Sequence, residues 1–360
     1  MLSWRKLSMK LHLGLLLLGL LFIGLGGLLY LWQEGLERSP VPGINKTAPA
    51  PWSEPPGGLV SENITYIVEA TFLIKNERDV SLPDIVKVYA PPNTTHQKVR
   101  IVSVEPEPFL VDRDENGNLR MNIKVNLSPN SEIWVNMTLE ITVQQYEADL
   151  NERAAMWPPL EISQRYTEPT IVWNVENETL RKLAREIVGD EDNPLIMARK
   201  LAYWIDENLE YKPNPENLTR GANYCVYRRN GNLIIFGDCT QAADVYITFA
   251  RSLGIPARAV SGLILMEKEE VQWRNLSMEE DPDRMVEHWR PHIWPQVYLE
   301  PWGWIDVDML VEHSWGVYSW RHIILEVEGE FVLDVEWLKM VESMVFDVEY
   351  IEYKVTPLEG

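Results

Sequence analysis

Cysteine is scarce in this chain of 360 residues, and basic side chains are far fewer than acidic ones. Two cysteines, Cys225 and Cys239, cannot build the dense disulfide framework of a small secreted domain. The formal net charge of −21 argues against nucleic acid as a partner, because an acidic surface repels phosphates. The sequence has no internal repeats, and its length suffices for two folded domains.

The N-terminal region contains a long uncharged apolar run. Leu13 to Trp32 would form a helix about 30 Å long, which is enough to cross a bilayer. Arg5, Lys6 and Lys10 precede this run, so the N-terminus should stay in the cytoplasm and the remainder should lie outside. No small-residue cleavage site follows, which favours an uncleaved anchor over a signal peptide. We therefore predict a single-pass protein of the cell membrane, held in the lipid bilayer by this helix.

Glycosylation motifs fit an external location for the larger part of the chain. Eight Asn-x-Ser/Thr sequons all follow the apolar run, although the motif is short and often unused. They lie at Asn45, Asn63, Asn93, Asn126, Asn136, Asn177, Asn217 and Asn275. The sequence thus predicts a glycoprotein facing away from the cytoplasm.

The next two parts of the chain read as a spacer and a β domain. Residues 33–60 are rich in proline, which is typical of an extended linker. Between 61 and 150, apolar residues alternate with polar ones, most clearly in Leu119 to Leu127 and Ile133 to Val143. Such alternation predicts antiparallel strands with one wet face, arranged as a small β-sandwich.

The pattern becomes helical after residue 150. Leu180, Leu183 and Ile187 have helical spacing, and strand-like runs follow a further helix that starts at Cys239. Helices followed by strands indicate an α+β fold. The predicted organisation is a cytoplasmic tail, a transmembrane helix, the linker, the β-sandwich-like domain, a catalytic core and a C-terminal β extension, at 1–10, 11–32, 33–60, 61–150, 151–315 and 316–360. The extension could complete the core sheet or form a small appended domain.

Cys239 has the setting of a reactive thiol. A free cysteine is usually a small buried hydrophobe, but this one stands at a helix start, where partial positive charge favours the thiolate. His292 and Asp308 follow in strand-like runs. A cysteine, a histidine and an aspartate are what thiol catalysis needs, because the base takes the thiol proton and the carboxylate orients the base.

The surrounding sequence resembles the transglutaminase-like superfamily over residues 195–310. The run Gly237 to Ala243, with Phe249 to Gly262, resembles the nucleophile helix and the next strand of that family. His292 to Leu299 resembles its histidine strand, and Gly303 to Asp308 its aspartate strand. The family often has glutamate where Gln296 stands and proline where Met309 stands, which puts details on the substrate side in doubt.

The resemblance implies a papain-like fold and a role for each site residue. Cys239 would be the nucleophile, His292 the base and Asp308 the orienting carboxylate. Asp306 is the reserve, because alternation places both carboxylates on one strand face. The family attacks an amide or peptide carbonyl, forms a thioester and releases an amine; water or a second amine then completes the reaction.

Two features around the nucleophile stay open. A disulfide between Cys225 and Cys239 would silence the thiol, and an unpaired Cys225 is an equal alternative. An acidic cluster at 279–283 could bind a metal, but solvated charge is the better interpretation. We expect no obligatory metal and no cofactor.

The sequence is consistent with two functions. The first is a membrane-anchored, outward-facing cysteine enzyme that acts on a protein or peptide at the cell surface, with hydrolysis favoured over cross-linking. The alternative is a non-catalytic cell-surface binding module with a vestigial triad.

Overall fold

The computed structural model describes residues 58–358 except for 213–219, 266–288, 311–313 and 329–339. The predicted tail and transmembrane helix, and nearly all of the predicted linker, lie outside the described residues. Within the described part of the chain, no helix is both long enough and apolar enough to span a membrane.

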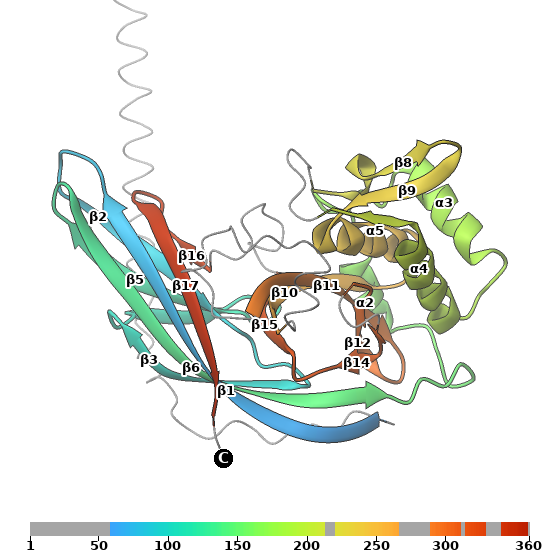
Figure 1. Cartoon of the computed structure of the whole chain (residues 1–360), viewed down its shortest axis with the longest axis horizontal. Coiled ribbons are helices and arrows are strands. Elements are labelled where there is room, and N and C mark those ends of the chain that lie inside the picture. Colours follow the sequence, from blue (N-terminus) through green and yellow to red (C-terminus); the bar gives the residue numbers. More distant parts are fainter. Residues whose placement is uncertain (1–57, 213–219, 266–288, 311–313, 329–339, 359–360) are drawn as a thin grey trace, which may run out of the picture. The chain divides into compact units, whose positions relative to one another are not determined.

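Two antiparallel sheets form the β domain (Figure 1). The first sheet has the order β14-β6-β1-β17, with β3 also paired to β6: Val317–Tyr318, Ser131–Ala148, Gly58–Asn76, Asp347–Pro357 and Gln97–Glu105. The second has the order β16-β2-β5-β4: Val341–Glu342, Leu82–Ala90, Leu119–Leu127 and Leu110–Arg113. Alternate residues such as Phe72, Met121 and Ile141 are buried in one core to which both sheets contribute. The period-two pattern therefore predicted these strands correctly, and Asn126 and Asn136 lie on exposed positions of them.

The C-terminal segment is divided between two parts of the fold. Strands β14, β16 and β17 complete the sheets of the β domain, and β17 pairs along most of β1. Strand β15 (His322–Val327) instead joins the sheet that carries the predicted site residues. The predicted extension at 316–360 is thus not a separate body, because its strands add to sheet edges formed much earlier in the chain.

Among the described residues, four α-helices and one 3₁₀ turn precede or flank the sheet that carries His292 and Asp308. They are α2 (Leu160–Tyr166), α3 (Glu178–Val188), α4 (Pro194–Asn208), η1 (Ala222–Tyr224) and α5 (Cys239–Ser252). Asn177 and Asn193 cap α3 and α4 by accepting hydrogen bonds from first-turn N–H groups, as caps commonly do. Helix α5 is buried along almost its whole length. It therefore forms the centre of the second hydrophobic core.

The sheet with the predicted site residues has the order β13-β12-β11-β10-β15: Ser314–Trp315, Gly303–Asp308, Trp289–Leu299, Ala257–Leu265 and His322–Val327. A small sheet of β7 (Leu209–Tyr211), β9 (Asn232–Gly237) and β8 (Val226–Arg229) leads directly into α5. Strands β12 and β15 are separated by two others, yet Asp308 and His322 are in contact. The large sheet is therefore strongly curled, as Figure 1 shows.

Candidate active site

Local hydrogen bonding fixes Cys239 as the first residue of α5. The Asp238 side chain accepts a hydrogen bond from the Thr240 N–H at 2.8 Å, and the Gln241 side chain accepts one from the Asp238 N–H at 3.0 Å. This reciprocal capping box defines a helix start. A Cβ at Gly237 would lie 2.5 Å from Gln241 Oε1, so only glycine lets that side chain fold back. Gly237, Asp238 and Gln241 are thus explained by the structure of the helix start. The helix start does not require a cysteine at position 239.

The thiol of Cys239 is harder to ionise than the sequence suggested. Burial, assisted by the negative charges of Asp238 and Asp308, raises its pKa to about 12. Hydrogen bonds from the Ile293 N–H and the Thr240 hydroxyl act in the opposite direction but do not compensate. The expectation that the helix start lowers the pKa is therefore wrong for this environment, since burial is the larger effect. A thiol held protonated needs a nearby base.

His292 and Asp308 lie beside that thiol. Ile293, which bonds to the thiol, is the neighbour of His292 on β11. Nε2 of His292 lies 3.3 Å from Oδ2 of Asp308 on β12, and both side chains are buried. Burial alone would raise the pKa of Asp308, but His292 and His322 hold it well below its usual value. The structure thus pairs His292 with an ionised Asp308 and places the thiol of Cys239 against the N–H of the next residue on β11.

A second histidine, which the sequence analysis missed, shares this carboxylate. Nε2 of His322 lies 3.2 Å from the same Oδ2 of Asp308, and its Nδ1 lies 3.2 Å from the Ser319 hydroxyl. His322 opens β15, an apolar run. In sequence, a histidine at the head of such a run reads as an ordinary core residue. Only the curl of the sheet carries it to Asp308.

Asp306, the reserve carboxylate, has different partners. Its Oδ1 accepts hydrogen bonds from Trp294 Nε1 at 2.7 Å and from Gln296 Nε2 at 2.9 Å. Gln296 Oε1 in turn accepts from Arg258 Nε at 2.9 Å. Burial raises the pKa of Asp306 despite these bonds. The alternation in the sequence placed both carboxylates on one strand face and could not distinguish them. In the structure, His292 lies against Asp308 rather than Asp306.

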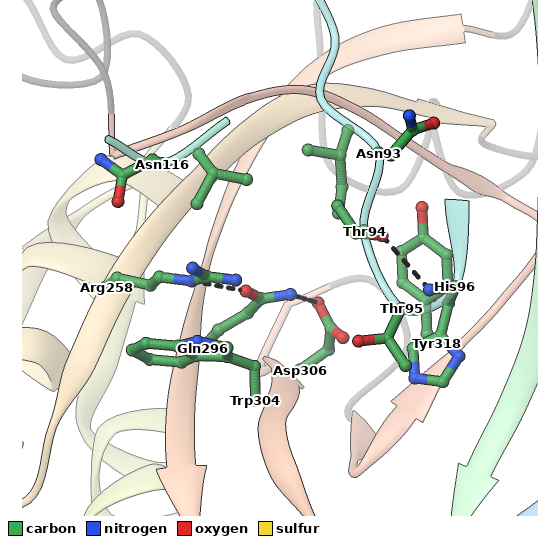
Figure 2. Close-up of a pocket in the computed structure, with 12 residues that line it drawn as sticks. Asn93, Thr94, Thr95, His96, Asn116, Arg258, Gln296, Trp304, Asp306 and Tyr318 are labelled. Atoms are coloured by element: carbon green, nitrogen blue, oxygen red, sulfur yellow. Dashed lines mark hydrogen bonds between the residues drawn. The ribbon is translucent and has the colours of Figure 1, made fainter. Parts of the chain in front are cut away.

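The Asp306 chain of hydrogen bonds lines a polar cavity of about 280 Å³ (Figure 2). Figure 2 shows Gln296 between Arg258 and Asp306. A glutamine suits this position, because its amide accepts from the guanidinium and also donates to the carboxylate. Glutamate, which the family often has here, would place two acidic groups against each other. The departure at Gln296 is therefore matched to its neighbours.

Trp294 connects this cavity to the three-residue site. Its indole donates to Asp306, and its ring stacks on His292 with ring centroids 5.5 Å apart and an angle of 17° between the planes. It also meets the edge of His322 at 4.9 Å. The indole therefore limits the movement of both imidazoles.

Cys225 is buried and forms no disulfide with Cys239. Both cysteines are free thiols in the structure, and Cys225 Sγ lies 3.7 Å from the Gly221 carbonyl oxygen. Burial raises the pKa of this thiol, so it is unreactive. Of the two alternatives left open by the sequence, the structure has the unpaired cysteine. The acidic cluster at 279–283 lies outside the described residues.

Comparisons with known proteins agree with this geometry. Residues 181–309 match the model of the transglutaminase-like superfamily. An uncharacterised protein from Haemophilus influenzae is 26% identical over 133 residues, which are 36% of this chain and 35% of that protein; the match thus spans about a third of that relative.

Among solved structures, a candidate cysteine protease from Cytophaga hutchinsonii aligns with a TM-score of 0.55 at 15% identity, over 84% of this chain and 93% of the other. The periplasmic domain of TgpA from Pseudomonas aeruginosa aligns over 69% of this chain and 90% of that domain, at 12% identity. Its TM-score of 0.31 is too low to show a common fold. The match over residues 181–309 thus agrees with the resemblance to the transglutaminase-like superfamily that the sequence motifs indicated.

Proposed function

We propose that this protein is a transglutaminase-like cysteine enzyme that cleaves amide bonds of a protein or peptide. The observation that carries the proposal is the contact of His292 Nε2 with Asp308, 3.3 Å away, beside a thiol that bonds to the Ile293 N–H. Because Nε2 faces the carboxylate, Nδ1 is the nitrogen left to serve the thiol. The arrangement assigns one role to each of the three residues.

The reaction begins with transfer of the Cys239 proton to His292 as Sγ attacks the carbonyl carbon of the substrate. His292 is the general base for this transfer, because the thiolate rather than the thiol is the nucleophile. Asp308 stabilises the imidazolium and fixes the ring. The tetrahedral intermediate collapses to a thioester as His292 gives the proton to the departing amine. The first-turn N–H of Cys239 has no intrahelical partner and can donate to the oxyanion.

Water then completes hydrolysis, activated by the same histidine, or a second amine completes transfer. We favour hydrolysis over amine transfer, and the candidate protease from Cytophaga hutchinsonii has a similar fold. We further propose that the enzyme is anchored by residues 11–32 and faces outward. The proposal of an anchor is supported by the uncharged run and by the basic residues before it.

A thiol-reactive probe tests the enzyme against the alternative of a binding module. We expect strong labelling of Cys239 that is lost in the His292→Ala variant, because the base is gone. Labelling of an ordinary thiol that is indifferent to this substitution would favour the binding module. A reductant should leave the labelling unchanged, since both cysteines are free.

Incubation of surface peptides with the protein and a primary amine separates the two chemistries. Mass spectrometry should show cleaved or deamidated products, and the Cys239→Ser variant should give none. Amine-linked peptides as the main product would count against hydrolysis.

A further inference from the structure

Three buried side chains at the site are arranged so that they could bind a metal ion, although the proposed mechanism involves no metal. Nε2 of His292, Oδ2 of Asp308 and Nε2 of His322 lie within 4.8 Å of one another. Two of the separations, both from Oδ2, are 3.2 and 3.3 Å. In a tetrahedral zinc site the ligand atoms are about 3.3–3.5 Å apart, given metal–ligand bonds of about 2.0–2.1 Å. We propose that this triplet binds a divalent transition-metal ion and that the bound ion inactivates the enzyme.

The orientation of His292 supports a metal position beside Asp308. Its Nε2 is buried and makes no hydrogen bond within the described residues, although Oδ2 is only 3.3 Å away. The ring nitrogen thus lies against the carboxylate with a poor hydrogen-bond angle, and the charge of His292 still acts to lower the pKa of Asp308. In a metal site the nitrogen lone pair likewise points at the ion, which lies to one side of the neighbouring ligand.

Groups around the triplet fit the support that such sites have. Asp308 Oδ1 accepts the Leu310 N–H at 2.9 Å, which fixes the carboxylate, and Ser319 Oγ lies 3.2 Å from Nδ1 of His322. Metal-binding histidines usually donate their second ring N–H to such a partner. The serine hydroxyl can donate to Nδ1 when His322 carries its proton on Nε2, and can accept from Nδ1 when the metal holds Nε2.

The ligand types indicate which ions would bind. Two imidazoles and one carboxylate suit Zn²⁺, Co²⁺, Ni²⁺ or Cu²⁺ and do not suit Ca²⁺ or Mg²⁺, which prefer oxygen ligands. The stacked indole of Trp294 adds an apolar wall. A divalent charge would also neutralise the buried carboxylate of Asp308.

Metal binding would disable His292 through its tautomer. With Nε2 on the metal, a neutral imidazole carries its proton on Nδ1, the nitrogen that must accept the thiol proton. If His292 is an imidazolium beforehand, its Nε2 proton is released to solvent on binding. The thiol of Cys239 then stays protonated without being a ligand. This consequence rests on the proposed function, whereas the binding of the ion does not.

Binding of Co²⁺ to the full-length chain, freed of metal by chelator dialysis, tests the site without an activity assay. We expect the wild type and Cys239→Ser each to bind one Co²⁺ ion with similar affinity. This binding should require His322, and Zn²⁺ should displace the cobalt. The visible spectrum should be that of tetrahedral cobalt with no thiolate charge-transfer band. His322→Gln should weaken binding at least about tenfold, because a ligand is lost. The control His96→Gln, which changes a buried histidine stacked on Tyr146, should bind like the wild type.

Three results would overturn the proposal. Loss of binding in Cys239→Ser, or a thiolate charge-transfer band in the wild type, would show that Cys239 is itself a metal ligand. Equal binding by His322→Gln and the wild type would put it elsewhere, and absence of binding would leave no site. Cys239→Ser keeps all three proposed ligands but lacks the proposed nucleophile. Metal binding by this variant therefore tests the site whether or not the proposed function is correct.

Discussion

His322 and His292 approach the same oxygen of Asp308, at 3.2 and 3.3 Å, from strands on opposite sides of β10. The carboxylate that orients the proposed base is thus itself held by a second imidazole. This arrangement makes His322 a positioning residue for the proposed reaction.

Substitution of His322 should slow catalysis and shift its pH dependence. His322→Ala removes a hydrogen bond to a charged group, worth about 1.5–3 kcal/mol, so kcat/KM should fall about tenfold to a hundredfold. Without His322 the pKa of Asp308 rises, so the carboxylate protonates at higher pH and the acid limb of the kcat/KM profile moves upward. His322→Gln should restore part of the rate, since its amide can donate to Oδ2. A chelator in these assays keeps the proposed metal site empty. An acid limb that does not shift in His322→Ala would contradict the role of His322 as a positioning residue.

Neutralising the helix cap should make Cys239 more reactive. Asp238 raises the pKa of the thiol, second only to burial, so Asp238→Asn should lower that pKa and increase alkylation by iodoacetamide at fixed neutral pH. The gain is up to about tenfold for each unit by which the pKa falls. Asparagine caps helices as well as aspartate, so the helix start should persist. The control Asp79→Asn changes an exposed carboxylate in the β domain. A slower or unchanged rate in Asp238→Asn alone would refute the charge effect.

The buried ion pair between Arg220 and Asp244 of α5 should contribute strongly to the stability of the fold. Asp244 accepts from Arg220 Nη2 at 2.7 Å and Nε at 2.8 Å, and from Trp173 Nε1 at 3.0 Å. Arg220→Met leaves a buried carboxylate without its counter-charge, and we expect a loss of about 3–5 kcal/mol in the free energy of unfolding. Urea denaturation measures this loss.

A matched pair provides the control for that measurement. Arg229→Met breaks the exposed pair with Glu210 and should change the stability much less than Arg220→Met does, because solvent screens this pair. The double variant Arg220→Met with Asp244→Asn should recover part of the stability, because the unpaired charge is removed. Equal losses for the buried and exposed pairs would contradict this account.

Gly262 should be intolerant of any side chain. It pairs with His292 on β11 and with Ile324 on β15, and a Cβ there would lie 2.0 Å from the Ile323 carbonyl oxygen. Gly262→Ala should therefore destabilise the fold by about 1–3 kcal/mol and loosen the strand that carries His322. Ser261→Ala, at the adjacent buried position, adds no atom and removes a hydroxyl without a hydrogen-bond partner within the described residues. Thermal unfolding of the two variants side by side provides the comparison; a tolerated alanine at 262 would show that β15 can shift freely.

Local patterns carried much of the prediction. The alternation in Leu119 to Leu127 and the spacing in the α3 segment depend on which face of one element is buried, and the structure has both elements. The capping residues at Gly237 to Gln241 act within a few residues, so the helix start at Cys239 was visible in sequence. The contacts that join β15 to Asp308 and β17 to β1 have no such local sign.

The sequence by itself determined the order of the elements, the helix start at Cys239, and the choice of His292 and Asp308 as its partners by resemblance. Tertiary structure decided the rest. It divided the C-terminal strands between two sheets, gave Asp306 to the cavity, raised the pKa of the thiol and brought His322 to Asp308. These features depend on burial and on contacts between distant strands, which arise only when the sheet curls and the core closes.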